Sequence, residues 1–163
     1  MYVWPGEAVQ GKDHYCTYLV DQGKKRVFAG GAAWDAIMDP NAKRTEDPLF
    51  AQMPDGDPIL PTARMIGASD GNGNYEAALL EKNGPYPNQR RVIMGSKALQ
   101  KYQLKDVHPG NMEHTAYHAI PAAPSEGFIY HDVSLRPPRP LNFSLNFNNA
   151  TTTAHCYVQI SER

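Results

Sequence analysis

The stretch Leu141-Asn142-Phe143-Ser144-Leu145-Asn146-Phe147 holds the clearest two-residue period in the chain. Apolar side chains alternate with amide and hydroxyl side chains, and successive side chains of a β-strand point to opposite faces. We therefore expect a strand with one apolar and one polar face. Asn148-Asn149-Ala150 follows and supplies turn residues, since asparagine tolerates left-handed backbone angles.

The segments on either side repeat the same pattern. Beyond the turn, apolar side chains recur at every second position from Ala154 to Ile160, so residues 141–160 are predicted to form an antiparallel hairpin. Residues 128–135 alternate in the same way and predict another strand. Between them, Arg136-Pro137-Pro138-Arg139-Pro140 cannot be an interior strand, because its three prolines donate no backbone N–H. We expect a stiff crossover there.

The rest of the chain reads as short strands and tight turns. Further strands are expected at residues 15–20, 26–29, 62–68, 75–80 and 91–94. Helical segments are expected at residues 32–38 and 97–103, with a third near 112–118 as the alternative to a loop. The predicted fold class is all-β, an antiparallel β-sandwich or jelly-roll-like arrangement with one or two short helices and long ordered loops. Residues 1–13 are expected to be an extended arm, and 14–163 a single β-rich domain.

Composition narrows the class of function. The chain has 163 residues with 16 Lys plus Arg and 17 Asp plus Glu, a net charge of -1, which argues against specific nucleic-acid binding. Its 14 prolines and 13 glycines predict many turns and extended connections. No run approaches the ~18 apolar residues of a membrane helix. The N-terminus shows no signal-peptide pattern, so we expect no membrane partner.

The two cysteines, Cys16 and Cys156, lie near opposite ends of the chain. Without a sign of secretion, the expectation is two reduced, buried thiols. A disulfide that joins the first and last strands is the alternative.

A candidate calcium loop runs from residue 70 to residue 81. Oxygen-bearing side chains occupy loop positions 1, 3, 5 and 12, a spacing that resembles an EF-hand loop; they are Asp70, Asn72, Asn74 and Glu81. Position 6, however, is Tyr75 instead of glycine, and residues 61–68 do not look helical. Because Asp-Gly and Asn-Gly are ordinary hairpin residues, a plain turn is expected and calcium is the alternative.

Three histidines, His108, His114 and His118, form the second candidate metal site. In a helix, His114 and His118 would share one face at i,i+4 spacing, which can bind a metal. The zincin motif needs glutamate directly after the first histidine, and this chain has Thr115 there. We find no nucleophile elbow, phosphate-binding loop or dinucleotide motif. The expectation is therefore no enzyme and no cofactor, with a β-sandwich or barrel metal-dependent enzyme or metal-binding module using these histidines as the rival.

The favoured hypothesis is a structural subunit of a large assembly, with a viral capsid or virion-associated (minor capsid or cement) protein as the expected class. Catalytic motifs are lacking, charge is near neutral, and arms and long loops gain order by lying on partners. The expected partners are other copies of the chain, other subunits of the assembly, or both, in a virion or another extracellular or cytoplasmic assembly. The expected interface residues are Tyr2, Trp4, Leu49, Phe50, Arg136 and Arg139. A carbohydrate- or peptide-binding module that uses Trp4 and Trp34 is a third hypothesis.

Overall fold

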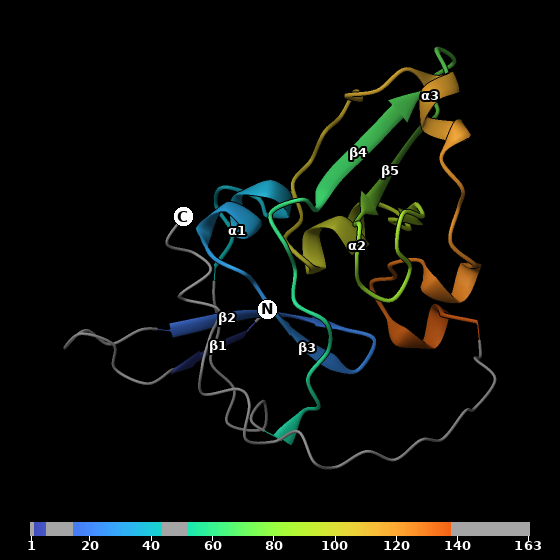
Figure 1. The fold of residues 1–163 in the computed structure, drawn as a ribbon. Helices are drawn as coiled ribbons and strands as arrows, with labels where there is room; N and C mark the ends of the chain where they lie inside the picture. Colours follow the sequence, from blue (N-terminus) through green and yellow to red (C-terminus); the bar gives the residue numbers. More distant parts are fainter. Residues whose placement is uncertain (1, 6–14, 44–51, 138–163) are drawn as a thin grey trace. The chain divides into compact units, whose positions relative to one another are not determined.

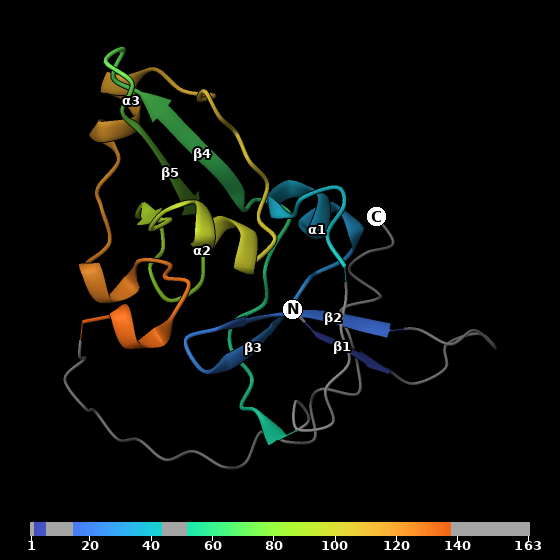
Figure 2. The ribbon, with the colours of Figure 1, turned by 180° about the vertical axis from the view of Figure 1, so that it is seen from behind.

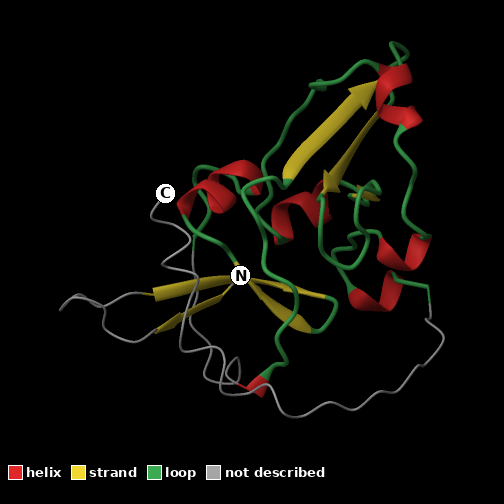
Figure 3. Ribbon diagram, viewed as in Figure 1, coloured by secondary structure: helices red, strands yellow, loops and turns green. Residues whose placement is uncertain are grey.

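The computed structural model describes residues 2–5, 15–43 and 52–137. Within these residues the chain forms two three-stranded antiparallel sheets, with strand orders β1-β2-β3 and β4-β5-β6, and three short α-helices (Figures 1 and 3). A strand-rich fold built from small antiparallel sheets is therefore confirmed. The predicted hairpin 141–160 lies outside the described residues.

The chain divides into two compact units. Of the described residues, the first unit holds 2–5, 15–34, 43 and 52–61, and the second holds 35–42 and 62–137. The boundary between residues 34 and 35 falls within helix α1 (Gly31–Ile37). The expected boundary between an arm and a single domain, at residue 13, lies in the undescribed range 6–14 and stays a prediction.

The sheet of the first unit consists of β1 (Tyr2–Pro5), β2 (Tyr15–Asp21) and β3 (Lys24–Val27). Gln22 and Gly23 connect β2 to β3 with φ angles of 54° and 76°, and two positive φ values match the right-handed twist of a hairpin. These two strands correspond to the strands expected at residues 15–20 and 26–29. Tyr2–Pro5, expected to be part of an arm, pairs with β2 of its own chain and places Tyr2 opposite Tyr18.

An irregular segment lies along the outer edge of β3. Backbone hydrogen bonds of 2.8–2.9 Å join Lys25 to Pro54 and Gly56, and Ile59 to Val27 and Ala29. Gly56 permits this close approach, because a Cβ there would lie 3.0 Å from Cγ of Arg26. Residues 54–59 thus cover the edge of the first sheet.

The sheet of the second unit consists of β4 (Arg64–Ser69), β5 (Tyr75–Leu80) and β6 (Arg91–Val92). Helix α2 (Ser96–Lys101) and helix α3 (His114–Ala119) belong to the same unit. Helix α3 lies beside the turn end of the β4–β5 hairpin in both views (Figures 1 and 2). The core there comprises Ile66, Ala68, Ala78 and Tyr117, packed against Leu80, Met112 and Ile120.

Both outer edges of the second sheet are also covered. On β4, the Asn111 carboxamide makes the hydrogen bonds that the backbone of a neighbouring strand would make. Its Oδ1 accepts from the Gly67 N–H and its Nδ2 donates to the Met65 carbonyl, both at 3.0 Å. The backbone N–H of Asn111 donates to the Gly67 carbonyl at 3.0 Å. On β6 and its flanks, hydrogen bonds come from residues 121–123 and 129.

The strand predicted at residues 128–135 is wrong. Short 3₁₀-helices occupy Ser125–Gly127 and Val133–Leu135, and Ile129 makes a single parallel bridge to Ile93. Asp132 explains the difference: its Oδ1 accepts from Ser134 N–H at 2.9 Å, and its carbonyl accepts from Leu135 N–H at 3.0 Å. These local hydrogen bonds stabilise a turn in place of the strand that the alternating pattern predicted.

The expected helices at 32–38, 97–103 and 112–118 correspond to α1, α2 and α3. The described residues therefore contain three short α-helices, where the fold class expected one or two.

Candidate functional site

The structure places the expected interface residues in different parts of the chain. Tyr2 and Trp4 share strand β1 of the first unit. Arg136 is half-buried at the end of the described part of the second unit. Leu49, Phe50 and Arg139 lie outside the described residues. Contact of these side chains with another subunit stays a prediction.

The candidate calcium loop is a hairpin turn organised by Asp70. One carboxylate oxygen accepts from the Asn72 backbone N–H at 2.7 Å, and the other accepts from the Asn74 side chain at 2.7 Å. These bonds, the one from the Asn74 side chain first, hold the pKa of Asp70 below its usual value. The Asp70 carboxylate therefore serves the turn itself, as expected for a plain hairpin.

Glu81, the twelfth residue of the loop, follows the far end of β5 and is 3% exposed. Six residues of extended chain separate it from the start of β5, a span of about 20 Å. The structure therefore does not bring Glu81 to Asp70, Asn72 and Asn74.

The histidines are divided between two settings. The rings of His114 and His118 lie on α3 with centroids 4.4 Å apart, and both side chains are exposed. His108 packs edge to face on Tyr75, with centroids 4.7 Å apart. Among residues 2–5, 15–43 and 52–137, no group of three or more His, Cys, Asp or Glu side chains is arranged to hold a metal ion. The structure thus brings together His114 and His118, the two histidines at i,i+4 spacing.

A partly buried network of side chains joins α3 to the second sheet, and no sequence pattern predicted it. Tyr117 donates its hydroxyl to Oε1 of Glu76 on β5 at 2.8 Å, and Arg90 donates to the same oxygen at 3.0 Å. The Arg90 guanidinium also lies over the Tyr117 ring, 4.7 Å from its centroid. Tyr117 is fully buried, and burial, together with its bond to Glu76, raises the pKa of its phenol well above the usual range.

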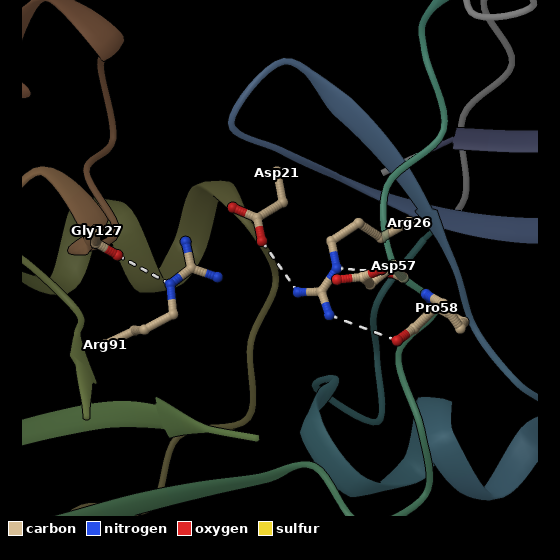
Figure 4. Close-up of polar contacts among 6 residues, drawn as sticks. All are labelled: Asp21, Arg26, Asp57, Pro58, Arg91 and Gly127. Atoms are coloured by element: carbon tan, nitrogen blue, oxygen red, sulfur yellow. Dashed lines mark hydrogen bonds and ion pairs between the residues drawn. The ribbon is translucent and has the colours of Figure 1, made fainter. Parts of the chain in front are cut away.

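In the first unit, Arg26 holds the segment that covers β3. Arg26 is 2% exposed. Its Nε donates to the Asp57 carbonyl at 2.8 Å, its Nη1 to Oδ2 of Asp21 at 3.0 Å, and its Nη2 reaches the Pro58 carbonyl at 3.5 Å (Figure 4). The neighbouring Lys25 forms an ion pair of 3.8 Å with Asp55, and burial lowers the pKa of Lys25.

Basic side chains of the second unit make the same kind of contact. Nε of Arg91 donates to the Gly127 carbonyl at 2.9 Å (Figure 4), and Nε of Arg90 to the Ile120 carbonyl at 2.7 Å. Nζ of Lys101 donates to the carbonyl of His131 at 2.6 Å, and Nζ of Lys105 to that of Asp35 at 2.5 Å. With Arg26 these residues form a set of five that we call the loop clamps; each binds a carbonyl 30 to 70 residues away.

An open hollow of about 380 Å³ lies beside α2 in the second unit. Its lining comprises Asp39, Asn41, Ala42, Ser96, Leu99, Gln100, Gln103, Leu104 and Asp106. Its two carboxylates already accept backbone hydrogen bonds, Asp39 from Asn41 at 2.7 Å and Asp106 from His108 at 2.9 Å. Both carboxylates therefore stabilise local turns of the backbone.

Comparison with known proteins gives no match to a family model, a curated protein or a solved structure. Within the described part of the chain, every helix is too short or too polar to cross a membrane.

Proposed function

We propose that this chain is a structural subunit of a large protein assembly and acts through contacts with copies of itself, with other subunits, or with both. A viral capsid or virion-associated protein is the proposed class. The observation that supports this proposal is the set of loop clamps, in which basic side chains, three of them buried arginines, bind backbone carbonyls that are distant in the sequence. Arg26, Arg90 and Arg91 are at most 8% exposed, and each binds a backbone carbonyl 30 to 36 residues away in the sequence.

Fixing a loop lowers the entropy that is lost when the loop binds a partner. A hydrogen bond from a charged donor contributes about 1.5–3 kcal/mol, which offsets the ordering of one or two backbone residues at about 1–2 kcal/mol each. Loops held in this way present the same surface on every copy of the chain. A subunit that must meet its neighbours repeatedly in one geometry needs such a surface.

The covered sheet edges also support this proposal. An uncovered edge strand can pair with strands of other chains and cause aggregation, and covering the edge prevents this. The outer edges of β3, β4 and β6 are covered by residues 54–59, by Asn111, and by residues 121–123 and 129, respectively. We infer that ordered contacts between subunits use loops and the N-terminal segment, and not strand addition at these three edges. A sandwich or jelly-roll-like arrangement remains part of this proposal.

Sedimentation velocity of the full chain over a wide concentration range tests the proposal. We expect species much larger than one chain, with the distribution shifted to smaller species by replacing Tyr2 and Trp4 with serine. Replacing the exposed Lys97 and Lys82 with serine is the matched control and should leave the distribution unchanged. A single chain at every concentration would contradict self-assembly, and a distribution insensitive to Tyr2 and Trp4 would contradict the proposed interface.

The His114–His118 pair supports a second candidate, a metal-binding module. Imidazole nitrogens at i,i+4 on one helix face can bind zinc, nickel or copper, and the two rings lie side by side here. Metal analysis of the purified chain separates the candidates. Stoichiometric metal that is lost in the His114→Ala variant would favour the metal-binding module over the assembly subunit.

A further inference from the structure

The sequence contains two Asn-Gly pairs, Asn72-Gly73 and Asn83-Gly84. Glycine has no side chain to shield its backbone nitrogen, so an Asn-Gly pair is the arrangement in which that nitrogen most easily reaches the preceding carboxamide. We propose that Asn72 is a site of spontaneous deamidation in the folded protein and that the fold protects Asn83.

The reaction needs water as its only co-reactant. The backbone nitrogen of Gly73 attacks Cγ of Asn72 and gives its proton to solvent, so that a new N–C bond closes a five-membered ring. The bond from Cγ to Nδ2 breaks, and Nδ2 leaves with an added proton as ammonia. Water then opens either carbonyl of the resulting succinimide. The products are aspartate or isoaspartate at position 72.

The turn leaves both reacting groups of the first pair accessible. Asn72 and Gly73 are exposed, and no atom outside the neighbouring residues lies within 4 Å of the Cβ position built on Gly73. The hydrogen bonds of the turn join Asp70 to the Asn72 N–H and to Asn74. Within residues 52–137, the Asn72 carboxamide and the Gly73 N–H make no hydrogen bond, so neither is held away from the other.

The second pair lies in different surroundings. The carboxamide oxygen of Asn83 is buried away from solvent, and Asn83 and Gly84 are both partly buried. Negative charge develops on this oxygen as the glycine nitrogen attacks. Water stabilises that charge at Asn72, whereas burial disfavours it at Asn83. The same burial restricts the rotation that the carboxamide needs in order to meet the nitrogen.

Deamidation would alter the tip of the β4–β5 hairpin. Either product places a second negative charge two residues from the Asp70 carboxylate. Isoaspartate also lengthens the backbone between Asp70 and Asn74 by one carbon. Both changes act on the turn in which Asp70 binds Asn72 and Asn74.

Incubation of the full chain in mildly alkaline buffer, followed by peptide mapping with mass spectrometry, tests the proposal. We expect position 72 to deamidate at least about tenfold faster than position 83, which corresponds to ~1.4 kcal/mol in activation free energy. In concentrated guanidinium chloride the two pairs should react at similar rates, because the difference comes from the fold. The Asn72→Gln variant should lose the native-state signal.

Comparable rates at the two positions in the folded protein would overturn the proposal, as would faster reaction at Asn83. A tenfold difference that persists after unfolding would also overturn it, since local sequence would then explain the preference.

Discussion

Tyr117 shows how one buried hydroxyl fixes a helix of the second unit. The Tyr117→Phe variant keeps the ring and removes the hydrogen bond to Glu76. Because Glu76 is partly exposed and water can replace the bond, we expect a loss of about 0.5–1.5 kcal/mol in unfolding free energy. Urea denaturation measures this loss. Thr115→Ala, at an exposed position of the same helix, is the control and should change stability by less than about 0.5 kcal/mol.

The raised pKa of Tyr117 also predicts a pH dependence. An unfolded tyrosine loses its proton near pH 10, whereas the folded Tyr117 keeps it. Above that pH the folded chain binds more protons than the unfolded chain, so the unfolding free energy falls as pH rises. The stabilisation is fully present below about pH 10. We expect Tyr117→Phe to show a shallower fall than the wild type in denaturation experiments on both sides of that pH; an identical fall would contradict the cause we assign.

Gly67 is a second position where one residue decides the packing. A Cβ there would lie 2.7 Å from the Tyr75 hydroxyl and 2.8 Å from Cγ2 of Val107. Gly67→Ala should therefore destabilise the chain by about 1–3 kcal/mol. Gly31→Ala is the matched control, since nothing lies within 4 Å and alanine favours the helix. Equal melting temperatures for the two variants would refute the crowding at Gly67.

At the scale of elements, Arg26 should be the most important side chain of β3. Arg26→Met removes a buried cation that binds Asp21 and the carbonyls of residues 57 and 58. We expect a loss of about 3–5 kcal/mol, the usual cost of breaking a buried ion pair by removing one partner. Lys24→Met, at an exposed position of the same strand, should stay within about 0.5 kcal/mol of the wild type. Similar denaturation midpoints would show that Arg26 does not hold the segment.

Local elements were predictable where the turn chemistry and the side-chain period agree. Asp21–Lys24 and the Asp70 turn each join two strands that the sequence predicted, because their turn residues act within a few positions. The segment 128–135 failed because Asp132 bonds its own neighbours in spite of the strand period. The segment 54–59 shows no period at all, and only its partner β3 reveals its role.

In the candidate sites, too, the sequence predicted only contacts between residues a few positions apart. The spacing of the i,i+4 histidines already placed His114 beside His118. Glu76, Arg90 and Tyr117 lie 14 to 41 positions apart in sequence, and no short motif connects residues at such separations. Asn111 likewise covers β4 through a contact 44 residues away. Such contacts depend on the tertiary fold, which local sequence does not specify.

For the whole molecule, the proposed function requires that the segments covering the sheet edges are held as firmly as the sheets themselves. Amide hydrogen exchange of the native chain measures this directly. We predict slow exchange at Gly56, Ile59 and Ala123, whose N–H groups donate to strand residues or to Arg90. The N–H of Gly73, exposed and without a hydrogen bond within the described residues, is the fast reference. Exchange of the three amides as fast as that of Gly73 would contradict the proposed function, because the loops would then offer no fixed surface for assembly.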